Sequence, residues 1–208
     1  MNEFQLISRY FEWPTPHADL GVGDDAALMS LQPGMQLAVS ADMLVEGRHF
    51  FAGTDPCMLG RKVLAVNLSD MAAMGAIPRW FTLSLALPSA DSTWLSAFST
   101  GMRAMADEFC VDLVGGDTTR GPLTISVQIM GEVEKGCGIL RSGARPGDDL
   151  WVSGMLGSAA AAVMHRSGRT VLPGNVLDSC AARLDNPIPR VDLGRSLRGV
   201  ASAALDIS

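Results

Sequence analysis

PCMLGRKVLAVNLSDMAAMGAIPRWFTLSLALP, residues 56–88, predicts a helix that is followed directly by a strand. Pro56 suits the first turn of a helix and Gly75 suits the position just past its end, so a helix is expected over 56–75. The residues WFTLSLAL at 80–87 favour a strand, which Pro88 ends. Helices that alternate with strands are typical of α/β and α+β folds.

The alternation continues on both sides of this stretch. Toward the N-terminus the pattern predicts a helix at 2–13 and a strand at 35–41. Toward the C-terminus it predicts a helix at 91–109, a short strand that Gly115-Gly116 ends, a strand at 123–133, a strand at 149–153, helices at 155–167, at 176–184 and from about 190, and a strand at 203–207. The glycine-rich stretch 134–147 interrupts this series, so we predict two domains, 1–136 and 137–208.

Composition excludes several classes of protein. With 48% hydrophobic residues among 208, the chain is not intrinsically disordered. A net charge of −6 argues against a nucleic-acid surface, and no apolar run is long enough to span a membrane. The charged N-terminus does not resemble a signal peptide, and the four cysteines form no C-x-x-C pair. We therefore expect a cytoplasmic protein with reduced thiols.

Aspartates recur beside glycines or at the ends of predicted elements. They are Asp25 in GVGDDAAL, Asp42 at the end of a strand, Asp70 in an apolar helix, Asp117 after two glycines, and Asp206 near the end of the chain. Loops at the ends of parallel strands meet at one face of a sheet, so these carboxylates are expected to converge. Clustered carboxylates repel one another and need a cation, for which Mg²⁺ is suited. Taken singly, each aspartate is better explained as a cap, a turn or a hydrogen-bonded helix position, and it is their repetition that favours a metal site.

The sequence also bears on phosphate binding. It contains no P-loop and no protein-kinase motifs, and its only lysines are Lys62 and Lys135. Metal ions would therefore have to neutralise a triphosphate. Gly115 and Gly116 allow backbone N–H groups to approach phosphate, and Arg141 could bind it through two hydrogen bonds. A tight turn and a solvated arginine are the alternative interpretations.

Seven segments carry a family resemblance when they are taken in order. They are GVGDDAAL (21–28), SADMLVEGRHF (40–50), KVLAVNLSDMAAMGAIP (62–78), LVGGDTTRGP (113–122), LRSGARPGD (140–148), NPIPR (186–190) and LDIS (205–208). Together they resemble the thiamine-monophosphate kinase family of the aminoimidazole-ribonucleotide-synthetase-like superfamily. The resemblance spans nearly the whole chain.

The resemblance implies ATP-dependent phosphorylation of thiamine monophosphate to thiamine diphosphate, by direct in-line transfer with several Mg²⁺ ions. No residue is expected to act as a catalytic base. The implied metal ligands are Asp25, Ser40, the carbonyl of Ala41, Asp42, Asp70, Asp117 and Asp206. The implied ATP contacts are Gly116, Asp117, Arg141 and Ser208, and the implied substrate contact is His49.

The resemblance also implies a two-domain α/β fold. The N-terminal domain, 1–136, would bind ATP and Mg²⁺ and form a β-barrel across a homodimer axis. The segment 137–208 would be the start of a truncated C-terminal domain. The family continues the terminal motif as DxSDGL, whereas this sequence stops at Ser208.

Two other interpretations remain open at this point. The chain could be a non-catalytic nucleotide- or metal-binding dimerisation fragment, which its early end favours. It could also be another ATP-using synthetase of the same superfamily. Selenophosphate synthetase needs a reactive cysteine beside a lysine near the N-terminus, but the first cysteine here is Cys57, on a predicted helix.

Overall fold

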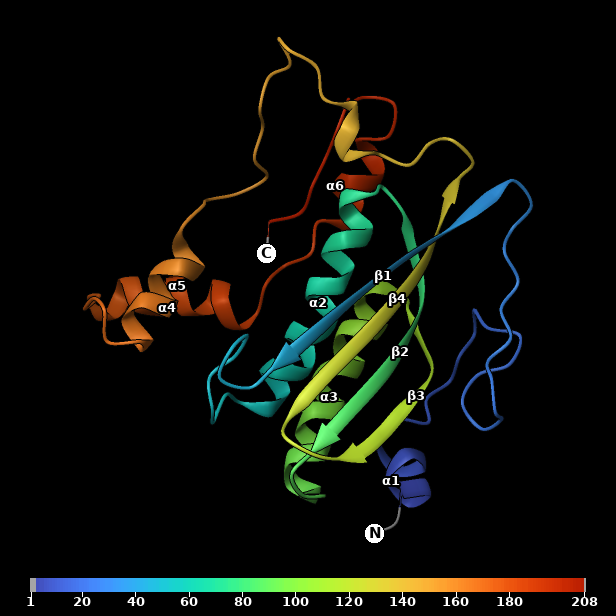
Figure 1. Cartoon of the computed structure of the whole chain (residues 1–208), viewed down its shortest axis with the longest axis vertical. Coiled ribbons are helices and arrows are strands. Elements are labelled where there is room, and N and C mark those ends of the chain that lie inside the picture. The colour runs from blue at the N-terminus through green and yellow to red at the C-terminus, as the bar shows by residue number, and fades with distance from the viewer. Residues whose placement is uncertain (1–2, 208) are drawn as a thin grey trace.

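A computed structural model describes residues 3–207 and shows helices covering one face of a four-stranded sheet (Figure 1). The strands are β1 (Met35–Val45), β2 (Ile77–Leu87), β3 (Asp112–Arg120) and β4 (Thr124–Glu134), in the order β1-β4-β2-β3. β4 runs antiparallel to both of its neighbours, whereas β2 and β3 are parallel. The parallel pair needs a crossover, and α3 (Ser92–Phe109) provides it.

Capping residues set where the two main helices begin. The Asp55 side chain accepts a hydrogen bond from the backbone N–H of Met58 at the start of α2 (Pro56–Ala73), 2.8 Å away. Asp91 caps α3 in the same way through the N–H groups of Thr93 and Trp94. Both helices therefore start close to the residues at which the sequence pattern placed them.

Two glycines allow α2 and α3 to approach each other closely. A Cβ on Gly60 would lie 2.1 Å from the carbonyl oxygen of Phe98, and one on Gly101 would lie 1.9 Å from that of Cys57. These helices cover the inner face of the sheet and form one apolar core with it. Its largest fully buried side chains include Leu64, Leu68, Phe81, Phe98, Met102 and Ile125.

The outer face of the sheet is only partly covered. Side chains alternate along β1, and the outward-pointing Leu37, Val39 and Met43 are 47%, 51% and 58% exposed. Further along the outer face, Trp80, Val114 and Met130 form a small apolar cluster with Ala18 and Ala27 of the N-terminal loop. A long strip of apolar side chains on β1 thus has no cover from residues 3–207 of the same chain.

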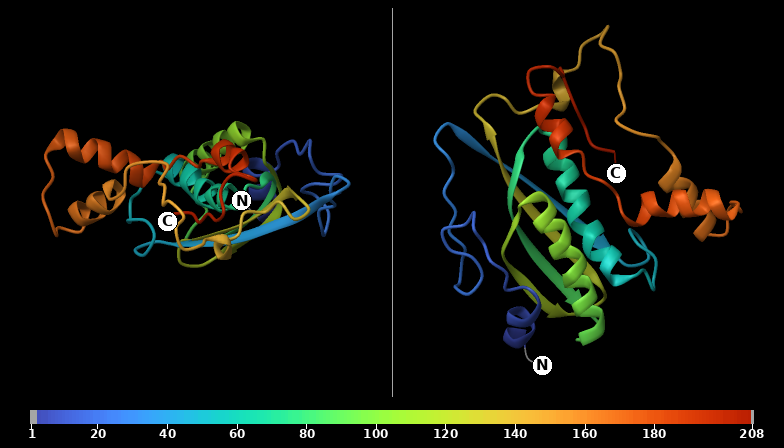
Figure 2. Two further views of the ribbon diagram at one scale, coloured as in Figure 1. Left: turned by 90° about the horizontal axis from the view of Figure 1, so that it is seen from above. Right: turned by 180° about the vertical axis from the view of Figure 1, so that it is seen from behind.

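The segments after β4 fall into two groups. α4 (Ser158–Arg166) and α5 (Gly174–Asp185) pair with each other and project to one side of the sheet (Figure 2). α6 (Val191–Ser196) packs on α2 instead, where a Cβ on Gly194 would lie 1.9 Å from the carbonyl oxygen of Ala72. The remaining helices are α1 (Glu3–Tyr10) and the 3₁₀ turn η1 (Arg141–Gly143).

Four predictions about strands were wrong. β3 continues through Gly115-Gly116 to Arg120, and β1 continues to Val45, so Asp42 and Asp117 lie within strands and not at strand ends. The segments 149–153 and 203–207 are irregular, and Leu150 and Trp151 are 96% and 87% exposed. A strand needs a neighbour with which to form hydrogen bonds, and these segments have none among the described residues.

The mixed α/β class is confirmed, but the four-stranded sheet is open and is not a closed barrel. Among the described residues, no helix is long and apolar enough to cross a membrane. The boundary between 1–136 and 137–208 stays a prediction.

Candidate functional site

Two of the predicted carboxylates meet between β1 and α2. Ser40 and Asp42 are two residues apart, so their side chains share one side of β1, where both are half-buried. The Ser40 hydroxyl donates a hydrogen bond to Oδ2 of Asp70 on α2, at 2.6 Å. This bond ties the helix carboxylate to the strand that carries Asp42.

A third carboxylate, that of Asp206, lies near the C-terminal end of the described residues. A Cβ on Gly143 would lie 1.8 Å from the carbonyl oxygen of Ser202, so only glycine lets the η1 turn pack against the segment before Asp206. Nη2 of Arg141 then lies 3.8 Å from Oδ1 of Asp206. The arginine side chain is 77% exposed, which leaves its other N–H groups free to meet a ligand.

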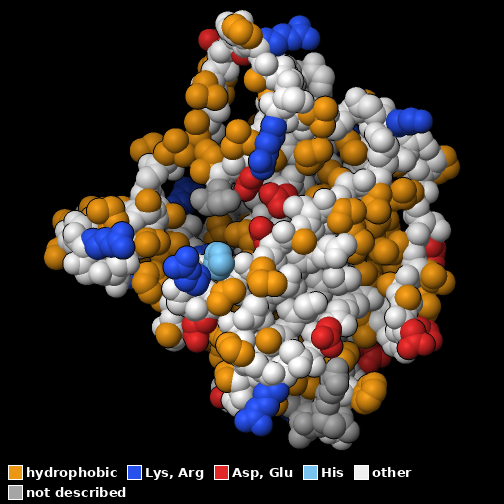
Figure 3. Space-filling model, viewed as in Figure 1, with side chains coloured by type: hydrophobic (Ala, Val, Ile, Leu, Met, Phe, Trp, Pro, Cys, Tyr) orange, Lys and Arg blue, Asp and Glu red, His pale blue; other side chains and the backbone are white. Residues whose placement is uncertain are grey.

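The three carboxylates form an electrostatically coupled group. The pKa of Asp42 is raised, first by burial and then by the negative charges of Asp70 and Asp206, while His49 acts in the opposite direction. Figure 3 shows acidic side chains gathered on this face beside basic ones. The arrangement disfavours a further negative charge and would be relieved by a cation.

The donor atoms suit a hard metal ion, although they do not form a complete site. Among residues 3–207, no three His, Cys, Asp or Glu side chains lie close enough together to hold a metal ion by themselves. Carboxylate and hydroxyl oxygens are nonetheless the ligands of Mg²⁺, which usually keeps several waters and shares its shell with substrate phosphates. Ser40, Asp42, Asp70 and Asp206 therefore fit Mg²⁺ that is bound together with a phosphorylated substrate.

Asp25 and Asp117 lie elsewhere. Asp117 is on β3, at the opposite edge of the sheet from β1, and three strand spacings amount to about 14 Å. Asp25 is exposed in the N-terminal loop, two residues before Ala27, which packs on the outer face of the sheet. The five aspartates do not converge within one chain.

The other predicted site residues are distributed as follows. Ala41 points outward from β1 and is exposed. Gly116 has φ of +151°, and a Cβ there would lie 1.8 Å from the carbonyl oxygen of Leu83, so this position in the sheet requires glycine. Ser208 lies outside the described residues.

His49 borders a small pocket that the sequence patterns did not reveal. Its Nδ1 accepts a hydrogen bond from the backbone N–H of Val45 at 3.0 Å, which orients the ring in the loop after β1. The pocket has a volume of about 80 Å³ and is lined by Gly47, Arg48, His49, Phe50, Phe51, Thr54, Lys62, Val163, Arg166, Leu184 and Asp185. These residues come from four separate segments, so no local pattern identifies them; the only hint is a lysine within the apolar stretch of α2.

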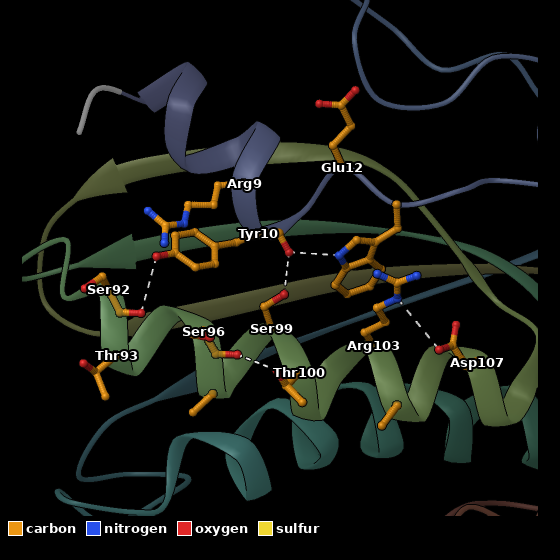
Figure 4. A pocket seen from close by; sticks show the side chains of 13 residues that line it. Arg9, Tyr10, Glu12, Ser92, Thr93, Ser96, Ser99, Thr100, Arg103 and Asp107 are labelled. Carbon is orange, nitrogen blue, oxygen red and sulfur yellow. Dashed lines mark hydrogen bonds and ion pairs between the residues drawn. The ribbon is translucent and has the colours of Figure 1, made fainter.

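Another concavity lies away from all of these residues. A groove of about 900 Å³ runs between α1 and α3 and contains none of the predicted site residues (Figure 4). Its charges are balanced, since Arg9 and Arg103 lie with Glu12 and Asp107. Size alone does not mark it as a binding site for an anion.

The chain is similar in sequence to known proteins along nearly its whole length. A family model described as "AIR synthase related protein, N-terminal domain" matches residues 23–133. Thiamine-monophosphate kinase of Escherichia coli (strain K12) is 43% identical over 210 residues, which cover 99% of this chain and 65% of the relative. The enzyme of the same name from Bacillus subtilis (strain 168) is 39% identical over 214 residues, which cover 99% of this chain and 66% of the relative.

The chain is also similar to solved structures along nearly its whole length. The crystal structure of thiamine-monophosphate kinase from Stenotrophomonas maltophilia K279a matches with a TM-score of 0.85 and 46% identity, covering 99% of this chain and 66% of that one. A structure described as AaThiL complexed with AMPPCP and TMP matches with a TM-score of 0.78 and 29% identity, covering 99% of this chain and 64% of that one. The chain thus spans about two thirds of the length of these relatives.

Proposed function

The chain belongs to the AIR synthase related proteins, and from this membership we propose that it is part of an enzyme that transfers the γ-phosphoryl group of ATP to thiamine monophosphate. The observation that carries the proposal is identity of 43% along 99% of the chain to a thiamine-monophosphate kinase. A relative of similar fold in complex with AMPPCP, an ATP analogue, and TMP supports the same pair of substrates. We further propose a cytoplasmic location, and a division of the chain into domains at 1–136 and 137–208.

The chemistry suits the residues at the site. The acceptor is a phosphate oxygen, which is largely ionised at neutral pH, so in-line transfer needs no general base. The transition state of phosphoryl transfer is loose, and catalysis rests on positioning and charge neutralisation. Mg²⁺, when bound, would neutralise the phosphates and hold them in line. This role fits a site of carboxylates with only two lysines in the whole chain.

Each of the residues has a proposed role in this reaction. The proposed Mg²⁺ ligands are Asp25, Ser40, Ala41 through its carbonyl, Asp42, Asp70, Asp117 and Asp206. The proposed ATP contacts are Gly116, Asp117, Arg141 and Ser208, and His49 is the proposed contact of thiamine monophosphate. Arg141 is supported by its exposed guanidinium beside Asp206.

The direct test is the formation of ADP by the complete gene product. We expect turnover with thiamine monophosphate and Mg²⁺, and no turnover with unphosphorylated thiamine, because only the former presents a phosphate as the nucleophile. Product is identified as thiamine diphosphate by chromatography. Equal rates with both acceptors would refute the proposal.

We also propose that the protein is a homodimer formed through the outer face of the sheet. The support is the exposed strip of Leu37, Val39 and Met43 on β1.

The proposed dimer interface can be tested by a substitution on β1. Val39→Lys places a charge in the centre of the apolar strip and is expected to convert the dimer to a monomer at micromolar concentration, as measured by analytical ultracentrifugation. Val171→Lys is the control, because Val171 is 88% exposed in the connection between α4 and α5. A wild-type protein that sediments as a monomer at tens of micromolar, or a Val39→Lys variant that stays dimeric, would contradict this interface.

A further inference from the structure

The pocket beside His49 is unusually rich in cations. Arg48, Lys62 and Arg166 line it together with His49, against the single carboxylate of Asp185. Asp185 is already engaged, because both of its oxygens accept hydrogen bonds from the guanidinium of Arg166. The carboxylate therefore does not neutralise the remaining cations of the pocket.

Lys62 is the most buried of these cations. Its side chain is only 8% exposed, and within the described part of the chain its Nζ makes one hydrogen bond, a long one of 3.4 Å to the carbonyl oxygen of His49. An ammonium group has three N–H donors, so donors remain available toward the pocket. Burial, with a contribution from Arg166, lowers the pKa of Lys62, whereas Asp185 acts to raise it. A buried cation with incomplete hydrogen bonding favours an incoming anion.

The pocket adjoins the carboxylate group described above. His49 lines the pocket and also acts electrostatically on Asp42. Lys62 and Asp70 are both on α2, eight residues apart, which separates them by about 12 Å along the helix axis and about 80° around it. An anion in the pocket would therefore lie at the border of the proposed metal site.

We propose that this pocket binds the phosphate group of the phosphomonoester acceptor, and that Lys62 makes the protein select a phosphorylated acceptor over an unphosphorylated one. This inference rests on the proposed function and assigns part of its substrate specificity to a residue outside the metal site. Arg48, which is exposed at the rim, and Arg166 would add to the positive field that the phosphate meets.

The size of the pocket favours the acceptor over the nucleotide. A volume of about 80 Å³ corresponds to two or three water molecules at roughly 30 Å³ each, which is enough for a phosphate group but not for an adenosine. A phosphomonoester carries its phosphate at one end of the molecule and can insert it alone. The exposed Arg141 lies beside Asp206 and remains available for the nucleotide.

The first test measures anion binding and does not depend on catalysis. Inorganic phosphate is titrated into the metal-free protein by calorimetry, and Lys62→Met is expected to weaken its binding roughly 10- to 100-fold, because a charged hydrogen bond is lost. Lys62→Arg keeps the charge and should restore most of the affinity. Lys135→Met is the matched control, since Lys135 is the other lysine of the chain and lies in the exposed turn after β4. Melting temperatures within a few degrees of wild type would show that each variant is folded.

The second test uses steady-state kinetics of the complete gene product. Lys62→Met is expected to raise the KM for thiamine monophosphate by the same factor, with the KM for ATP unchanged; a merely structural role would not separate these two constants. Phosphate binding that is absent in wild type or unaffected by Lys62→Met would overturn the inference, as would an unchanged KM for thiamine monophosphate. If phosphate binds in a Lys62-dependent way but the wild type does not turn over thiamine monophosphate, the proposed function fails and the anion pocket stands.

Discussion

Asp42→Asn is expected to reduce ATP turnover with thiamine monophosphate about 10²- to 10³-fold at saturating Mg²⁺, the loss typical of removing one preorganised electrostatic contact. The amide keeps the shape of the side chain but cannot supply the negative charge that a magnesium ligand provides. The same substitution should leave the metal-free protein as stable as wild type or more stable. The reason is that Asp42 is partly buried and is repelled by Asp70 and Asp206.

The pH dependence of stability follows from the sign of this pKa shift. A carboxyl group whose pKa is raised on folding binds its proton more tightly in the folded state. Its ionisation therefore destabilises the metal-free fold as the pH rises from the unfolded pKa through the higher folded pKa of Asp42. Asp42→Asn removes this penalty, so its stabilising effect should be present at neutral pH and disappear in acid.

Thermal melting without metal and ATP turnover with Mg²⁺ together show whether Asp42 acts as a metal ligand or has a structural role. Asp178→Asn is the control for loss of one negative charge, because Asp178 is exposed on α5, away from β1. A lower metal-free melting temperature with activity retained would mean that Asp42 has a structural role and that the metal-site proposal is wrong.

Gly101→Ala is expected to have the largest effect on stability. A Cβ at this position would lie 1.9 Å from the carbonyl oxygen of Cys57, and backbone atoms of α2 cannot rotate away as a side chain could. Separating the two helices would disturb the core that they share with the sheet. Overpacking typically costs about 1–3 kcal/mol, which for a chain of this size lowers the melting temperature by roughly 2–12 °C.

The control for this substitution is Gly174→Ala in the first turn of α5. A Cβ there would have no heavy atom within 4 Å, and Gly174 is not among the glycines with positive φ. Replacing glycine by alanine in such a place restricts the unfolded chain and should leave stability unchanged or slightly raised. Equal melting temperatures for Gly101→Ala and wild type would show that α2 and α3 do not pack through their glycines.

The elements that the sequence predicted correctly are those whose signals are local. The helix predicted at 56–75 is α2, and the strand predicted at 80–87 lies within β2. Capping residues, prolines and apolar periodicity act over a few residues and can be recognised without knowledge of the fold. The helices at 91–109, 155–167 and 176–184 were found for the same reason.

The errors occurred where pairing with distant residues decides the structure. Gly115-Gly116 looked like the end of a strand, but β3 continues past these glycines because it pairs with the parallel strand β2 as far as Arg120. Gly116 is needed there because a side chain would collide with the backbone of Leu83. The apolar segment 149–153 looked like a strand because of its side chains. Its backbone has no partner strand among the described residues.

The candidate site shows the same difference between what local motifs predict and what only the fold brings together. The aspartate-rich motifs directed attention to Asp42, Asp70 and Asp206, which the fold does bring into electrostatic contact. No pattern in the sequence revealed that Asp117 lies at the far edge of the sheet. The cationic pocket is still less visible, because Lys62 and Arg166 are more than a hundred residues apart.

The irregular segment around Trp151 has an optical consequence. Trp80 is 2% exposed, Trp13 and Trp94 are partly buried, and Trp151 is 87% exposed. Emission from Trp151 should therefore be red-shifted and open to collisional quenching by acrylamide, while the other indoles are shielded. Any molecule or polypeptide that settles over this segment would change that one component, so the chain carries its own fluorescent reporter of contact at this site.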